Sequence, residues 1–212
     1  ALDMEEIMLA SFANEDLFFM HSSFMNPEQA NWVSESGKES YNQADTERAK
    51  QLLEEAGYNG EEVRMMATRD YDHHYSAAVV VQEQLENIGV NVKLEIFDWP
   101  TLNQRINDPE LWDIFFTSTG YITTPSQLLP LNSDFAGWTN DPKITELLNA
   151  MRTAETLEEA EAHWDELQGF LWNDYVSNSM FGHYSNILGT TDKLEGFTVF
   201  RGTIPWNTKV LE

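Results

Sequence analysis

The sequence of 212 residues contains no cysteine, which excludes disulfide bonds, thiolate metal sites and cysteine nucleophiles. It is also poor in cations, with 12 Lys and Arg against 36 Asp and Glu and a formal net charge of −24. Nucleic acid is therefore not an expected partner, because binding to phosphates needs clustered Lys and Arg. The charge is typical of a solvated surface, and it leaves open a field that attracts cations.

Other patterns are missing as well. No run of 18 apolar residues occurs, so no transmembrane helix is predicted. The 11 glycines are scattered and form no phosphate-binding loop, and no G-x-S-x-G motif marks a nucleophilic serine. His73 and His74 have no further ligand at metal-binding spacing, so we predict neither a metal site nor another cofactor. Catalysis by paired carboxylates is not excluded by counting, because acids are abundant.

Apolar residues make up 42% of the chain, enough for a buried core, and their spacing predicts the elements. From residue 62 to 119, the spacing of apolar residues alternates between that of a strand and that of a helix. This order implies right-handed crossovers and a parallel or mixed sheet. Around this unit we expect helices at 3–12 and 45–56, a helical hairpin from 141, and a strand at 177–185. Within 62–119 we expect strands at 62–68, 90–96 and 112–119, a helix at 75–88, and a short helix capped by Asp98.

Rings and hydroxyl groups gather where the predicted strands end. In sheets of this kind, ligands bind beyond the carboxyl ends of the strands. Aromatic rings supply contact area there, and hydroxyl groups supply directional hydrogen bonds. The sequence therefore predicts a ligand-binding cleft formed by Trp99, Arg105, Ser118, Tyr121, Thr123, Thr124 and Trp138.

Several segments in order resemble a known family. Residues 41–58, YNQADTERAKQLLEEAGY, and residues 84–95, QLENIGVNVKLE, are similar to two of its signatures. A third block, from Asp98-Trp99 to Arg105 and on to Trp112-Asp113-Ile114, follows at matching spacing. On these motifs the chain resembles the family 5 solute-binding proteins of ABC transporters, the oligopeptide, dipeptide and nickel-binding class, over about residues 1 to 200.

The resemblance implies an α/β fold, namely a lobe of the type II periplasmic-binding-protein kind. It implies a mixed, mostly parallel sheet flanked by helices. Residues 1–212 would be the C-terminal ligand-binding lobe of a two-lobed protein, without the N-terminal lobe. Ala1 to Glu6 show neither an initiating Met nor an export signal, so we expect a fragment of a longer chain.

The resemblance also implies a function. We expect the extracytoplasmic solute-binding component of an ABC importer, which captures a small polar solute such as a peptide or an oligosaccharide. It would deliver the solute to a membrane permease and ATPase complex, act as a monomer, and carry out no enzymatic reaction. Its location would be periplasmic or extracellular, with a lipoprotein anchor in a Gram-positive source.

Two residues carry over directly, since Trp99 and Arg105 match positions that face the cleft in peptide-binding relatives. Those relatives hold the peptide amine with an acidic residue after the third strand, but residues 118–125 here contain no acid. A buried ammonium group without a counter-ion is costly, so a neutral or sugar-like solute fits at least as well. The alternatives are a peptide or nickel-chelate binder, an α/β hydrolase with paired carboxylates, and a pure interaction module.

Overall fold

The computed structural model describes residues 1–199 and 203–211. The helices in this part of the chain are α1 (Met4–Phe12), α2 (Thr46–Glu55), α3 (Asp72–Asn87), α4 (Trp99–Arg105), α5 (Pro142–Thr153) and α6 (Leu157–Asn173). The strands are β1 (Phe18–Phe19), β2 (Glu62–Thr68), β3 (Asn91–Phe97), β4 (Ile114–Phe115), β5 (His183–Tyr184), β6 (Leu194–Glu195), β7 (Thr198–Val199), β8 (Thr203–Ile204) and β9 (Lys209–Val210).

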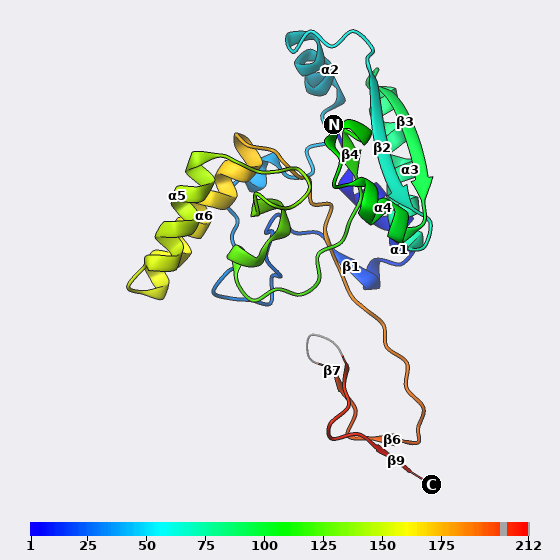
Figure 1. Ribbon diagram of the computed structural model, residues 1–212, viewed down its shortest axis with the longest axis vertical. Coiled ribbons are helices and arrows are strands. Elements are labelled where there is room, and N and C mark those ends of the chain that lie inside the picture. The colour runs from blue at the N-terminus through cyan, green and yellow to red at the C-terminus, as the bar shows by residue number, and fades with distance from the viewer. Residues whose placement is uncertain (200–202, 212) are drawn as a thin grey trace.

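A parallel sheet in the order β3-β2-β4 forms one side of the body, on the right in Figure 1. Met65 and Ala67 of β2 point to one face, where they pack with Ile7 of α1 and with α3. Met66 points to the other face, where it packs against α4. The parallel pairing and the α/β class predicted from the alternation of strands and helices are confirmed, and all three strands of this sheet run the same way.

Three predicted elements differ from the structure by more than two residues at one end. The third strand, expected at 112–119, is reduced to β4 because the Ser118 side chain turns towards α3 and the chain leaves the sheet after Phe116. The strand expected at 177–185 is only β5, since its partner β1 offers two residues for pairing. Helix α3 begins three residues before the predicted Tyr75, and it therefore includes both His73 and His74.

Helix α2 forms where predicted and lies at the surface of the body. The Asp45 side chain caps it by accepting a hydrogen bond from the Arg48 backbone N–H at 2.8 Å. The helix has no buried residue and Leu52 is 48% exposed, but Ala49 and Leu53 are half-buried and pack against the core of the sheet. In Figure 1, α2 stands at the top of the molecule, and only part of its apolar face contacts the body.

A second core lies between the α5–α6 hairpin and the long segment that follows α1. Gln168 of α6 is fully buried there and holds that segment through three hydrogen bonds. Its Oε1 accepts from the Phe24 backbone N–H at 3.2 Å, and its Nε2 donates to the carbonyl oxygens of Ser34 and Ser36 at 2.9 and 3.0 Å. One amide side chain thus satisfies three backbone groups of an irregular segment.

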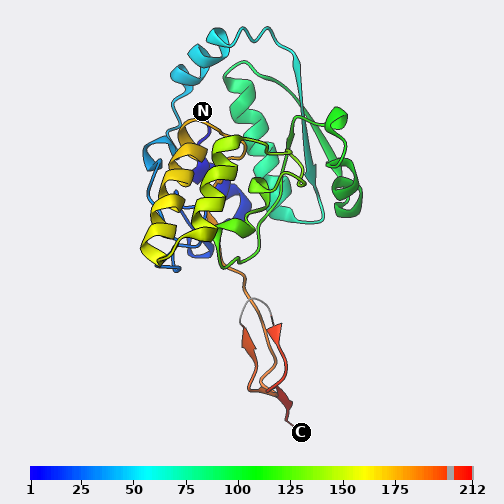
Figure 2. The same ribbon diagram turned by 60° about the vertical axis from the view of Figure 1, so that its left-hand side comes forward.

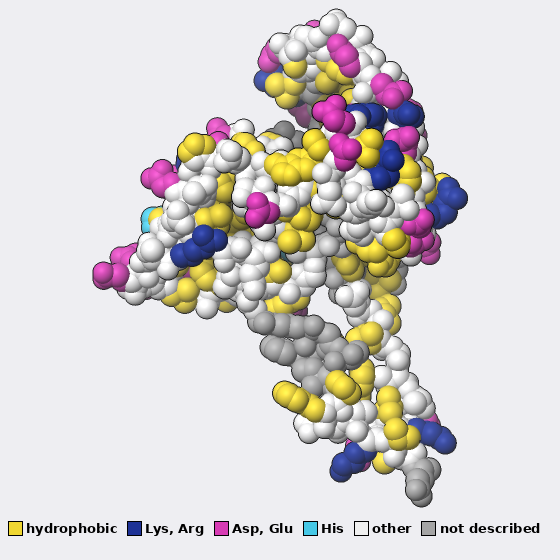
Figure 3. All heavy atoms as spheres, viewed as in Figure 1, with side chains coloured by type: hydrophobic (Ala, Val, Ile, Leu, Met, Phe, Trp, Pro, Cys, Tyr) yellow, Lys and Arg dark blue, Asp and Glu magenta, His cyan; other side chains and the backbone are white. Residues whose placement is uncertain are grey.

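The chain ends in an extended arm that starts after β5 and carries two short antiparallel pairs, β6–β9 and β7–β8. Figures 1 and 2 agree that the arm projects from the body. Its hydrophobic side chains are exposed, with Ile187 at 73%, Trp206 at 84% and Val210 at 76% (Figure 3). No helix in the described part of the chain is long and apolar enough to cross a membrane.

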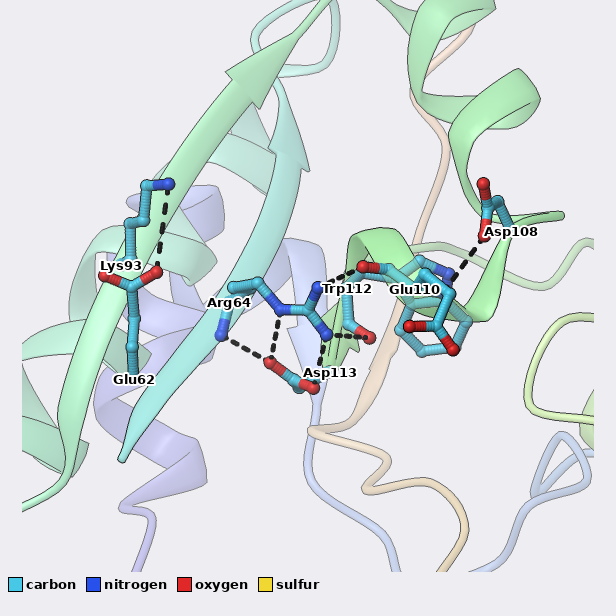
Figure 4. A network of polar contacts seen from close by, with 7 residues as sticks. All are labelled: Glu62, Arg64, Lys93, Asp108, Glu110, Trp112 and Asp113. Carbon is cyan, nitrogen blue, oxygen red and sulfur yellow. Dashed lines mark hydrogen bonds and ion pairs between the residues drawn. The ribbon is translucent and has the colours of Figure 1, made fainter. Parts of the chain in front are cut away.

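Arg64 of β2 fixes the approach to β4 at the amino end of the sheet (Figure 4). Its guanidinium donates to both carboxylate oxygens of Asp113, at 3.0 and 2.9 Å, and to the carbonyl oxygens of Glu110 and Trp112. The Arg64 backbone N–H also donates to Asp113 at 2.7 Å. The hydrogen bonds from Arg64 hold the pKa of the Asp113 carboxyl below its usual range.

We expect Gln168→Leu to destabilise the chain. The change leaves the Phe24 N–H and two carbonyl oxygens without partners, and unpaired buried groups cost about 1–3 kcal/mol each. The free energy of unfolding in urea should therefore fall by about 3 kcal/mol or more. Gln104→Leu, at an exposed position of α4, is the matched control and should change it little. Equal losses in the two variants would contradict the assigned role of Gln168.

We expect Arg64→Met to lower the melting temperature by a few degrees at pH 7. Because the Asp113 pKa is depressed in the folded state, this contribution to stability is present above the unfolded pKa and is lost as the pH falls. The difference between wild type and variant should therefore shrink below about pH 4. Arg48→Met, which removes an ion pair within α2, is the control and should show a smaller effect at pH 7.

Candidate functional site

The carboxyl ends of the three parallel strands meet at one edge of the sheet, and short polar contacts lock the loops there. Thr68 closes β2, and its Oγ1 accepts a hydrogen bond from the Asp70 backbone N–H at 3.1 Å. The Asp70 carboxylate then accepts from the backbone N–H of Trp99, the first residue of α4, at 2.7 Å. The loop after β2 is thereby tied to the loop after β3, which places Trp99 beside the start of α3.

A pocket of about 240 Å³ opens at this edge. Rings from α3, α4, β5 and the loop before α3 form its walls, and the Ser118 hydroxyl group lies among them. The lining residues are Tyr71, His73, His74, Trp99, Ser118 and Tyr184. Ligands of parallel sheets bind at such an edge, and ring-lined concave sites are typical binding sites.

The two histidines converge on one hydroxyl group. His74 Nε2 lies 2.6 Å from Ser118 Oγ, and His73 Nε2 lies 3.4 Å from the same oxygen. His74 is buried, and its Nδ1 has no hydrogen-bond partner. Adjacent side chains on a helix seldom share a target, but here the first turn of α3 directs both rings at Ser118.

Burial keeps this pair of imidazoles uncharged at neutral pH. Burial lowers the pKa of His74 to about 4, and the neighbouring His73 adds to the effect. Burial also lowers the pKa of His73, against the opposing influence of Asp72. None of the six lining residues is Asp, Glu, Lys or Arg, so the pocket is polar without a full charge.

The remaining rings hold the histidines in place. The Tyr71 ring packs edge-on against Trp99, with centroids 5.2 Å apart and planes at 79°. Phe12 of α1 stacks on both His73 and Tyr184, at 5.5 and 5.0 Å. Such contacts stabilise ring orientation beyond the burial of area. The pocket is therefore built from α1, α3, α4 and the root of the arm.

The structure brings together two of the predicted site residues, Trp99 and Ser118. The other three on the β4 side lie further along the loop. Thr123 donates through its N–H and its hydroxyl to Gln127 Oε1, while the Thr124 hydroxyl pairs with Ser126. Tyr121 is 51% exposed on the same loop.

Arg105 and Trp138 are elsewhere. The Arg105 guanidinium lies over the Phe97 ring, 4.5 Å from its centroid, and Arg105 Nε is buried without a partner. Trp138 stacks on Trp112 at 6.0 Å, at the edge of the small core beneath α4. Neither residue lines the pocket.

Four lining residues were missed from the sequence, namely Tyr71, His73, His74 and Tyr184. Tyr71 was within the predicted end of β2, so its position was a usable signal. Asp72 and then the two histidines follow it, but the helix was predicted to begin at Tyr75, so their position in its first turn was not used as a signal. Tyr184 arrives from a segment more than 100 positions away along the chain, and no local pattern indicates that contact.

A larger hollow of about 350 Å³ lies beside α5, away from the strand ends. Hydroxyl and amide groups and Arg152 line it, and it contains no aromatic ring. Most of its polar lining is exposed to solvent, so it lacks the walls of a binding pocket. Within residues 1–199 and 203–211, no group of three or more His, Asp or Glu side chains is placed to hold a metal ion.

A protein-family model matches most of the chain. The family described as bacterial extracellular solute-binding proteins, family 5 Middle, matches residues 1–162. Among curated proteins, the chain is 31% identical over 199 residues to a Sinorhizobium fredii protein named "Probable peptide ABC transporter periplasmic-binding protein y4tO". That match covers 85% of this chain and 36% of the relative.

Solved structures share the fold. A dipeptide-binding protein of a Pseudoalteromonas species, in complex with Met-Leu, matches 99% of this chain and 43% of its own, with a TM-score of 0.81 and 20% identity. The oligopeptide-binding protein AppA of Bacillus subtilis, in complex with a nonapeptide, matches 100% and 46%, with a TM-score of 0.81 and 19% identity. The type II periplasmic-binding-protein fold is thereby confirmed. The chain spans less than half the length of these relatives.

We expect His74→Gln to change how stability depends on pH. Because the His74 pKa is lower in the folded state, the unfolded chain takes up the proton first, and stability falls as the pH drops from about 6.5 to about 4. The variant should lose less stability over this range, by on the order of 1 kcal/mol, in urea unfolding at pH 7 and pH 4.5. His163→Gln, on α6 outside the pocket, should follow wild type. Parallel curves for His74→Gln and wild type would disprove the assignment.

Proposed function

Because the chain belongs to the family 5 bacterial extracellular solute-binding proteins, we propose that it is one lobe of the solute-binding component of an ABC importer. The relative in Sinorhizobium fredii is named as a peptide transporter component of this kind. The role proposed for the chain is non-covalent capture of a solute, followed by delivery to a permease. It acts without bond chemistry.

One observation carries this proposal: an uncharged, ring-walled pocket lies at the carboxyl edge of the parallel sheet. The pocket is open on one side, where Tyr71 is 42% exposed. A solute in it would contact this lobe on one side only. Closure of a second lobe over the solute would supply the missing contacts, as in hinge-closing binding proteins.

The second lobe is part of the proposal. The chain spans 36% of its curated relative, so most of that relative's length lies outside the match. The projecting arm exposes Ile187, Trp206 and Val210, which a partner surface would cover. We assign residues 1–212 to the C-terminal lobe and the arm to contact with the N-terminal lobe.

The proposed solute is small and polar. The pocket offers Trp99 as a wall and Ser118 as a hydrogen-bonding group, and Tyr121, Thr123 and Thr124 follow on the adjoining loop. A peptide amine would need a carboxylate, which neither the pocket lining nor residues 118–125 contain. The hydrolase alternative draws no support, since paired carboxylates are absent from the same lining.

Partners and location follow from the same proposal. The partner is a membrane permease and ATPase complex, and the receptor works as a monomer outside the cytoplasmic membrane, in the periplasm or on a lipid anchor. The strongly acidic composition, with Asp and Glu side chains on the face of the body in Figure 3, suits a solvated protein.

We expect Trp99→Ala in the full-length protein to weaken solute binding by about tenfold or more, because buried aromatic side chains dominate binding energy. A thermal-shift screen of the full-length protein against peptides, oligosaccharides and metal chelates first identifies the solute. Calorimetry then measures the affinity of each variant for it. Trp138→Ala is the matched control and should bind as wild type does.

Equal losses in the two variants would place the solute away from the pocket and support the sequence-based prediction for Trp138. Residues 1–212 alone should bind the solute weakly, since half of the contacts are missing. Tight binding by this chain without a second lobe would contradict the two-lobed proposal. A solute panel that leaves the melting temperature of the full-length protein unchanged would count against import.

A further inference from the structure

We propose that the pocket selects an uncharged ring that carries a hydroxyl group, with the ring against Trp99 and its hydroxyl on Ser118. This inference rests on the proposed function, because it names the class of solute group that the lobe accepts. It draws on the shape, the charge and the hydrogen bonding of the six lining residues.

The shape favours a ring. Five of the six lining side chains are themselves rings, and they enclose about 240 Å³. Tyr71 and Trp99 stand nearly perpendicular, at 79°, and thus offer one ring face and one ring edge. Flat or cyclic groups make offset-stacked and edge-to-face contacts with such walls, which adds to the gain from burial.

The charge disfavours ionised groups of either sign. An ammonium group would lose its water without meeting a carboxylate in the lining, since Asp70 and Asp72 flank Tyr71 along the chain but neither lines the pocket. An anion would meet two neutral imidazoles and the field of a chain with a net charge of −24. An uncharged group avoids both penalties.

The hydrogen bonding supplies the polar anchor. His74 Nδ1 is buried without a hydrogen-bond partner, and we assign it as the ring nitrogen that carries no proton. The reason is that an unpaired acceptor costs less free energy than an unpaired N–H donor. His74 Nε2–H then donates to Ser118 Oγ at 2.6 Å. The Ser118 hydroxyl then donates its proton to His73 Nε2 over the longer distance of 3.4 Å. A hydroxyl oxygen of the solute can take the place of His73 as the acceptor.

The test uses small fragments and the full-length protein, with binding followed by the ring resonances of Trp99 and His73 in NMR. Benzyl alcohol, benzylammonium and benzenesulfonate share one ring and differ in charge. At pH 7.5, benzyl alcohol should bind at least about tenfold more tightly than either ion, because an unpaired buried charge is costly. Tight binding of either ion would overturn the proposal, as would no binding of any neutral fragment.

The role of Ser118 needs a separate comparison. Toluene lacks only the hydroxyl of benzyl alcohol, and wild type should prefer the alcohol by several fold. Ser118→Ala should remove this preference without removing the binding of the ring, whereas Ser126→Ala, in the hollow beside α5, should preserve it. A preference that survives in Ser118→Ala would refute the anchor. Methyl glucoside in the same assay distinguishes a sugar ring from an aromatic one.

The two proposals fail in different ways. If the solute screen identifies a ligand but neutral rings do not perturb the pocket, the import function stands and this inference is wrong. If neutral rings bind at Trp99 but no solute stabilises the full-length protein, the pocket assignment stands and the import function is wrong.

Discussion

The burial of β2 on both faces is the constraint on which the rest of the structure depends. Met65, Met66, Ala67 and Thr68 are all fully buried, with helices α1 and α3 on one side of the strand and α4 on the other. A strand enclosed in this way has one accessible end for function, and its neighbours run parallel to it. The loops after β2, β3 and β4 are therefore forced together at one edge, which is where the pocket forms.

Local sequence patterns predicted an element well where its residues show a clear strand or helix periodicity or begin with a capping residue. The bounds of β2 agree with the sequence to the residue, and the Asp45, Asp98 and Thr156 caps each accept from the first turn of their helices. The site could be predicted only in part, because pocket formation is a tertiary event. Trp99 and Ser118 follow strand ends and were found, whereas Tyr184 reaches His73 through the pairing of β5 with β1, which no spacing reveals. The exposure of α2 is a similar case, since amphipathic spacing predicts a face but not its partner.

Charged side chains are distributed differently on the surface and in the pocket. Most Lys and Arg side chains on the body pair with Asp or Glu at the surface, as Arg48, Arg64 and Lys143 do. The pocket instead excludes full charges and keeps two titratable rings neutral by burying them. Under the proposed function, a solute would be recognised by shape and by hydrogen bonds, which low local polarity strengthens. An uncharged solute would then need no acid in residues 118–125.

The arm and the pocket meet at one place, the root of the arm at Tyr184. Tyr184 lines the pocket from β5, and the next residue begins the arm that projects from the body. Its neighbour His183 stacks on Phe19 at 5.1 Å and contacts the Ser23 carbonyl oxygen at 2.9 Å, so this root is anchored to the lobe. A solute ring bound as proposed would contact Tyr184, and a second lobe held by the arm would be coupled to that solute through His183 and Tyr184. Under the proposed function, the solute would therefore bias lobe closure through the root of the arm as well as through contacts across the cleft.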